Sequence, residues 1–348
     1  MVRCVTNILS TIIMMFNFKK YFRCFFWVSA AISLHCAAAF TSLLLEDDLY
    51  LSVNNRMEIN DGGAHYLGGN KQVIHFALAP TVPVLKISNN SSLIISNAAL
   101  HDFSLSAVFV EPGSSLILAQ NCRVRWASDF GTADAKPLTL QIGNQIVFDL
   151  AAMTLRLDEQ IKLQLAPQSQ LLIKNGTLIL AAPNCLEGGE TFVLTLKKTK
   201  LLLASKDFCL QQGTLRLAGN CKILAAHKSA QLRFASSGLL QVLPHATLTL
   251  GSGLTLVYEP NDNDSQTRPS HFQLHALATL VLDRAVICCA QPEGIIFAQG
   301  QILVRNYAKF IKAPGLADLR PEVTLGSNCH LAITKHAVLS CGLGLRVK

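Results

Sequence analysis

Short stretches of the chain alternate aliphatic and polar residues with a period of two, from about residue 83 onward. Residues 138–142, 177–180, 214–217 and 247–250 show this alternation most clearly. Because successive side chains of a strand point to opposite sides, the pattern predicts β-strands with one buried face. Helical spacing is hard to find along the chain, so we expect an all-β protein.

One short phrase recurs along the sequence: two alternating aliphatic residues, a polar turn residue, a small residue and another aliphatic. The polar turn residues are Asn97, Asn121, Asn175, Asn220, His245 and Asn328. Asn tolerates left-handed backbone and suits a sharp corner between strands. Repeats of roughly 20 to 50 residues are typical of stacked units. We therefore predict a single-stranded parallel β-helix (β-solenoid) of roughly ten coils, each of about 22–25 residues.

The N-terminal segment, residues 1–39, is typical of an export signal. Basic residues between positions 19 and 23 precede an apolar run, and residues 37–39 are Ala-Ala-Ala, a small-residue cleavage site. We expect cleavage after Ala39 and export to the periplasm, the cell surface or the medium. A start near Met14 rather than Met1 would give a more conventional signal. An uncleaved anchor is the alternative, although the apolar run is shorter than a spanning helix needs.

The remaining chain divides into two parts by its sequence pattern. Residues 40–82 are expected to form an N-terminal cap and the first rung, and residues 83–348 the solenoid proper. Residues 259–270 are polar, lie between prolines and lack periodicity. We expect them to form a loop that projects from one coil, and such loops often carry binding sites.

Residues 68–76 read Gly-Gly-Asn-Lys-Gln-Val-Ile-His-Phe, a turn followed by an alternating strand. Together with the strand pattern that precedes it, this segment resembles the opening rung of right-handed parallel β-helix proteins. These form the pectate-lyase-like superfamily, which includes many exported surface proteins and adhesin passenger regions. The resemblance implies a β-helix fold and an exported protein, and it carries over no catalytic residue.

The composition supports an ordered chain with a modest positive charge. Half of the residues are hydrophobic and 15% are charged, which argues against disorder. The expected signal contains four basic residues and no acid, so its removal lowers the formal charge from +8 to 8 − 4 = +4. We expect no cluster of Lys and Arg, and therefore no nucleic-acid partner. An acidic glycan or a host or cell-surface protein is the expected partner.

Eight cysteines follow the expected signal. Three of them, Cys122, Cys221 and Cys329, occupy the small position after a turn Asn, where Ala or Gly stands in other copies. This interchange indicates small buried hydrophobic residues, with a disulfide or metal role as the alternative. No pair has the spacing of a Cys-x-x-Cys motif, and the sequence does not specify pairing.

Metal-ligating residues gather near the expected loop. Asp262 and Asp264 offer hard oxygen ligands of the kind that calcium uses, and His271 and His275 lie four residues apart. The calcium pattern is incomplete and a third metal ligand is missing, so these four residues are weak candidates. We expect no catalytic residue and no cofactor.

Sugar cleavage requires paired acids or metal-assisted proton abstraction, and this chain has few clustered acids. The adjacent Asp47 and Asp48 would face opposite ways on a strand. The favoured hypothesis is therefore a noncatalytic exported solenoid with a structural or adhesive role. Alternatives are a carbohydrate-active β-helix lyase or hydrolase, an outer-membrane β-barrel, and a pair of β-sandwiches.

Overall fold

The computed structural model describes residues 42–69, 72–78, 80, 82–127, 137–189, 191–227, 229–234, 237–258, 272–290, 295–313 and 321–347. The expected signal peptide and the expected loop at 259–270 lie outside these residues. The described chain is built from β-strands, with one short 3-10 helix, η1 (Leu105–Ala107). Within it, no helix is long and apolar enough to cross a membrane.

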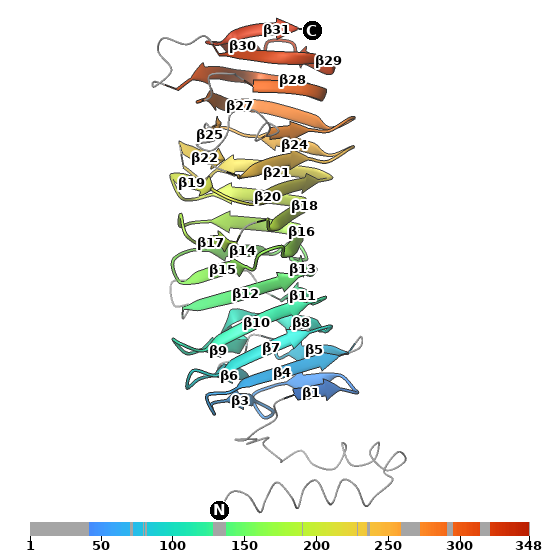
Figure 1. Ribbon diagram of the computed structural model, residues 1–348, viewed down its shortest axis with the longest axis vertical. Coiled ribbons are helices and arrows are strands. Elements are labelled where there is room, and N and C mark those ends of the chain that lie inside the picture. The colour runs from blue at the N-terminus through green and yellow to red at the C-terminus, as the bar shows by residue number, and fades with distance from the viewer. Residues whose placement is uncertain are drawn as a thin grey trace, which may run out of the picture. The chain divides into compact units, whose positions relative to one another are not determined.

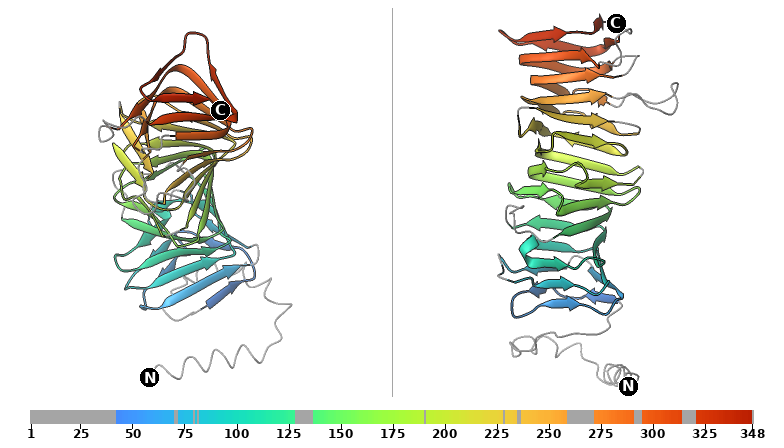
Figure 2. Two further views of the ribbon diagram at one scale, coloured as in Figure 1. Left: turned by 45° about the horizontal axis from the view of Figure 1, so that its top comes forward. Right: turned by 90° about the vertical axis from the view of Figure 1, so that its left-hand side faces the viewer.

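The strands wind around a common core in successive coils, each passing through three faces in the order face 1, face 2, face 3 (Figures 1 and 2). Face 1 contains β1 (Ser42–Leu45), β4 (Ala64–Gly69), β7 (Ser92–Ser96), β10 (Ser115–Gln120), β12 (Leu138–Asn144), β15 (Ile161–Leu165), β17 (Leu186–Gly188), β19 (Asp207–Leu210), β22 (Ala230–Phe234), β25 (Leu254–Tyr258) and β30 (Val338–Cys341). Face 2 contains β2 (Leu49–Leu51), β5 (Val73–Phe76), β8 (Ala99–Phe103), β11 (Arg123–Trp126), β13 (Ile146–Asp149), β20 (Thr214–Ala218), β23 (Leu239–Val242), β26 (Phe272–Leu274) and β31 (Gly344–Val347).

Face 3 contains β3 (Met57–Ile59), β6 (Leu85–Ile87), β9 (Val108–Val110), β14 (Thr154–Leu157), β21 (Asn220–Ala225) and β24 (Thr247–Leu250). The long strands bend around corners and belong to more than one face: β16 (Gln170–Leu180), β18 (Val193–Leu203), β27 (Thr279–Cys289), β28 (Ile295–Lys312) and β29 (Glu322–Ile333). Pairing between these strands is parallel, for example between β16 and β18. The β-solenoid prediction is thus confirmed, with about 11 turns, and the antiparallel sandwich alternative is wrong.

Inward-facing aliphatic residues stack in ladders that hold the coils together. On face 3, Leu155 pairs in register with Leu178, which pairs with Leu201, then Ile223, then Leu250. Each of these side chains is at most 2% exposed. Burying such a side chain contributes about 1.5–3 kcal/mol, so the ladder supplies cohesion between every pair of neighbouring coils.

An aromatic ladder fills the core beneath face 2. Phe76, Phe103, Trp126 and Phe148 are each at most 3% exposed. Their ring centroids follow one another at 5.2, 5.2 and 5.5 Å, each pair in edge-to-face geometry. Aromatic rings prefer this arrangement because the positive edge of one ring meets the negative face of the next.

Coil length varies more than the sequence repeat predicts. Ser92 pairs with Ser115 at a sequence separation of 23, and Arg216 pairs with Gln241 at a separation of 25, as expected. Gln241 pairs with Gln273 at a separation of 32. This coil is longer than 22–25 residues because it also contains positions 259–271.

The polar turn residues were predicted to mark corners, and four of them do. Asn97, Asn121, Asn175 and His245 have φ values of 52°, 50°, 59° and 60°. They do not share one corner, however. Asn97 and Asn121 connect face 1 to face 2, whereas Asn175 and His245 connect face 2 to face 3.

The prediction of a turn is wrong at Asn220 and Asn328. Asn220 begins strand β21, and the left-handed position is taken by Gly219, with φ 64°. Asn328 lies inside β29, which continues through the corner. Glycine adopts positive φ without steric cost, so Gly219 can take the left-handed corner position in place of the neighbouring Asn220.

The three cysteines that follow predicted turn residues are buried, as predicted. Cys122, Cys221 and Cys329 are 0%, 2% and 8% exposed and have free thiols. The Cys122 thiol lies 3.3 Å from the carbonyl oxygen of Ile95, and the Cys221 thiol lies 3.3 Å from that of Leu196. Cys122 and Cys221 therefore act as small core residues whose weak S–H donors face backbone carbonyls.

Candidate functional site

An open groove runs along the corner between faces 2 and 3, and basic side chains line it. We call it the lysine groove. Its lining residues are Arg125, Asp149, Ala151, Ala152, Asn175, Gly176, Thr177, Lys198, Thr199, Lys200, Asn220 and Lys222. They come from strands β11, β13, β16, β18 and β21 and from the corners that connect them.

The first row of charges lies on the outward side of face 2. Arg125 pairs in register with Asp149, Asp149 with Lys174, and Lys174 with Lys197. The residues that precede them, Val124, Phe148, Ile173 and Leu196, point into the core and are at most 2% exposed. Strand alternation therefore forces these four charged side chains into one outward column.

The second row lies across the corner, on face 3. Thr177 pairs in register with Lys200, and Lys200 pairs with Lys222. Between the two rows, Asn175 and Lys198 occupy the corner itself with φ values of 59° and 53°. The tight corner brings both rows to the same groove.

Asp149 is the acid that lines the groove, and it is fully engaged. Its carboxylate lies 3.0 Å from Lys174 Nζ and accepts hydrogen bonds from Asn175 Nδ2 at 3.1 Å and from the Ala151 amide at 3.2 Å. Partial burial opposes ionisation, but these donors outweigh it and lower the pKa of Asp149. The group stays ionised near neutral pH and neutralises Lys174.

Five cations of the two rows and the corner remain uncompensated. Within the described part of the chain, no ion pair involves Arg125, Lys197, Lys198, Lys200 or Lys222. The expectation that Lys and Arg form no cluster is therefore wrong. The run Lys197-Lys198-Thr199-Lys200 was a signal for it, together with Lys174 one coil earlier and Lys222 one coil later.

No protein-family model, curated protein sequence or solved structure matches this chain.

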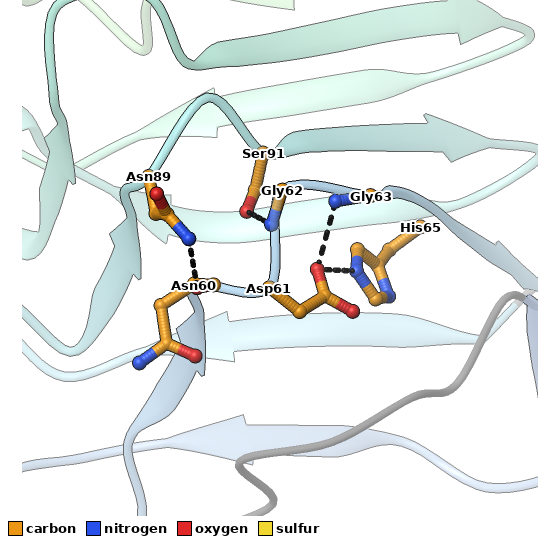
Figure 3. Close-up of polar contacts among 7 residues, drawn as sticks. All are labelled: Asn60, Asp61, Gly62, Gly63, His65, Asn89 and Ser91. Atoms are coloured by element: carbon orange, nitrogen blue, oxygen red, sulfur yellow. Dashed lines mark hydrogen bonds and ion pairs between the residues drawn. The ribbon is translucent and has the colours of Figure 1, made fainter.

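A second polar cluster lies at the corner between faces 3 and 1, near the start of the described chain (Figure 3). His65 Nε2 lies 2.7 Å from Asp61 Oδ1, which also accepts a hydrogen bond from the Gly63 amide at 3.0 Å. Both contacts lower the pKa of Asp61, and the hydrogen bond with His65 has the larger effect. Ser91 Oγ accepts a hydrogen bond from the Gly62 amide at 2.9 Å.

This second cluster caps the corner rather than forming a reaction centre. Ser91 is fully buried and His65 is 4% exposed, so neither side chain is open to a substrate. Asn89 Nδ2 donates to the Asn60 carbonyl at 2.8 Å, and the Asn89 amide donates to Glu111 at 2.7 Å. These hydrogen bonds pair polar backbone groups of the turns in successive coils. Left unpaired, such groups would destabilise the fold.

One of the four predicted metal candidates, His275, lies in the described chain. Asp262, Asp264 and His271 lie outside the described residues, so their role stays a prediction. His275 follows β26, and its backbone amide donates to the Val242 carbonyl at 3.1 Å. No group of three or more His, Cys, Asp or Glu side chains in the described residues could hold a metal ion.

The adjacent acids near the start of the chain also differ in environment. Asp48 accepts a hydrogen bond from the Val73 amide at 2.8 Å and lies 3.7 Å from His75. His75 stacks on Tyr50 at a ring-centroid distance of 4.5 Å and meets the edge of His101 at 5.4 Å. Asp48 thus supports an outward ring stack, and both Asp48 and the neighbouring Asp47 are exposed.

Proposed function

We propose that this protein is an exported, noncatalytic binding solenoid that attaches to an anionic partner at the cell surface or outside the cell. The lysine groove carries the proposal. Four cations line it, Arg125, Lys198, Lys200 and Lys222, and none of them has an ion-pair partner in the described chain. A row of fixed positive charges attracts anions at long range and costs little entropy on binding, because the backbone is already ordered.

A binding role suits the groove better than sugar cleavage. Glycosidases use two carboxyl groups, one of which must hold a proton near neutral pH. The acid that lines the groove is Asp149, and its lowered pKa keeps it ionised. Lys174 and Asn175 occupy its oxygens, so it is placed to organise side chains rather than to transfer a proton.

Export is supported by the N-terminal sequence, in which basic residues, an apolar run and Ala37–Ala39 follow one another. The test has two parts. Cell fractionation with a C-terminal epitope should find the protein outside the cytoplasm and shortened at its N-terminus. Purified protein should bind anionic polymers without releasing reducing ends from them, with or without calcium. Cytoplasmic retention, or sustained cleavage of any polymer, would overturn the proposal.

A further inference from the structure

We infer that the lysine groove binds a single chain of a linear sulfated polysaccharide, laid along the axis on which the coils stack. The inference rests on the proposed function and names the chemical class of its ligand. Four observations support it: the spacing of the cations, the width of the basic stripe, the type of cation, and the polar groups between them.

The cations are spaced by the coils themselves. From Arg125 through Asp149, Lys174 and Lys197 to the coil of Lys222, the groove crosses four coil-to-coil steps. At about 4.8 Å a step, the charged stretch is roughly 19 Å long. A sugar unit in an extended polysaccharide is close to one such step in length. A linear glycan with regularly repeated anionic groups can therefore meet successive coils in turn.

Apolar side chains border the basic stripe on both sides in its middle coils. On face 2 the next outward column contains Val147 and Leu172, between Arg123 and Thr195. On face 3 the next outward column contains Ile179, Leu202 and Leu224, which follow Arg156. A DNA duplex carries phosphates on two strands that flank grooves of about 6 and 12 Å, and it would need a second row of cations. A single chain needs one row, and its less polar ring faces can lie against the apolar side chains of the middle coils.

Lysine predominates in the groove, and its ammonium groups can pair with sulfate esters. The guanidinium of Arg matches a planar carboxylate with two parallel hydrogen bonds, whereas the ammonium of Lys is a compact point charge. Three lysines and one arginine line the groove, and that arginine, Arg125, lies next to Asp149 in the ladder. A sulfate ester spreads its charge over three oxygens and needs no fork-shaped donor.

The groups between the cations suit sugar hydroxyls. Asp149, Asn175, Thr177 and Asn220 line the same groove. The side-chain amide and hydroxyl groups of Asn175, Thr177 and Asn220 can exchange hydrogen bonds with sugar hydroxyls. The mixture of cations with hydroxyl-binding groups therefore favours a sulfated glycan over nucleic acid.

Titration calorimetry with the purified protein tests the inference. The probes are heparin, chemically desulfated heparin, polygalacturonate and a DNA duplex, each at low and at physiological salt. We expect heparin to bind, and its logarithmic affinity to fall linearly with logarithmic salt concentration. The double variant K200Q/K222Q should bind heparin about tenfold more weakly and lower the salt slope by roughly 1.5. The control K162Q/K206Q removes the same charge outside the groove and should bind as the wild type does.

A variant in the opposite direction separates recognition from damage to the fold. Asp149→Asn removes the negative charge from the groove and should raise heparin affinity about threefold at low salt. Circular dichroism of each variant should match the wild type. Equal loss of affinity in K200Q/K222Q and in K162Q/K206Q would overturn the inference, and so would a fall in affinity with Asp149→Asn.

The failure of this inference is distinguishable from failure of the proposed function. Equal or tighter binding of desulfated heparin or polygalacturonate would overturn the sulfate preference and leave an anion-binding solenoid. Tighter binding of DNA would overturn the choice of a glycan. No binding to any probe would overturn both the proposed anionic partner and the proposed sulfated glycan. Cytoplasmic retention or glycan cleavage would contradict the proposed function alone.

Discussion

Lys200 and Lys222 lie directly opposite each other on neighbouring parallel strands of face 3, both exposed and both without an ion-pair partner in the described chain. Like charges placed opposite each other destabilise a sheet by about 0.2–1 kcal/mol. A pair that weakens the fold needs another reason to stay in this position. The ligand binding that we propose for the lysine groove would supply that reason.

Replacing one member of this pair should stabilise the protein. We expect Lys222→Gln to raise the free energy of unfolding by about 0.5 kcal/mol at low salt, because it removes the repulsion from Lys200. The gain should shrink at high salt. Urea titration followed by circular dichroism measures both effects, with Lys162→Gln as the control. A loss of stability at low salt would contradict the repulsion.

The lowered pKa of Asp149 links stability to pH. A carboxyl group whose pKa is lower in the folded state contributes stability above its unfolded pKa of about 3.9, and this is lost as pH falls through the folded value. Asp149→Asn should therefore lower the melting temperature near pH 6 and make it less sensitive to pH below about 4. Thermal melts from neutral to acidic pH would show this. Parallel melting curves for the two proteins would refute the link.

The aromatic ladder beneath face 2 should be sensitive to a cavity. Phe103 lies edge-to-face between Phe76 and Trp126 and is 1% exposed. Phe103→Ala should cost about 3–5 kcal/mol, and Phe103→Leu clearly less. Because each coil contacts only its neighbours, the loss should be local.

Fluorescence can detect this local loss. In a Trp27→Phe background, Trp126 is the remaining tryptophan of the chain. With Phe103→Ala, its emission should shift at lower urea concentration than the far-ultraviolet circular dichroism changes. Coincident transitions would mean that the coils unfold as one unit.

Two strand glycines on face 1 make a matched pair. A Cβ added at Gly143 would lie 2.0 Å from the carbonyl oxygen of Ala119 in the neighbouring coil, whereas one at Gly68 would be 3.9 Å from its nearest atom, Ser96 O. Gly143→Ala must displace backbone and should destabilise by about 2 kcal/mol or more. Gly68→Ala should be nearly neutral. Similar unfolding midpoints for the two variants would show that the neighbouring coil yields more easily than expected.

Thiol reactivity should follow burial. Burial raises the pKa of Cys185 to about 11 and also raises the pKa values of Cys122 and Cys221. Because the thiolate is the reactive form, these three should resist Ellman's reagent near pH 8 until the protein is unfolded. Cys341 is exposed and should react first. Labelling of native protein followed by peptide mass mapping gives the order, and early labelling of Cys185 would contradict it.

The strands and their buried faces were predictable from the sequence alone. Alternation at residues 177–180 places Leu178 and Leu180 inward, and both are buried. The interchange of Cys with Ala and Gly after turn residues likewise predicted burial of Cys122 and Cys221. These features are local, because the two-residue period of a strand dictates which side chains share a face.

Tertiary structure decided which residues meet across coils. Gln241 and Gln273 stack at a sequence separation of 32, against 23 for Ser92 and Ser115, so sequence spacing does not locate each corner. The turn phrase therefore marks two different corners, and Gly219 rather than Asn220 takes the left-handed position. Register between coils is set by the packing of inward side chains, since a slip of one residue would turn a buried face outward. That packing, and not proximity along the chain, assembles the basic residues of the lysine groove.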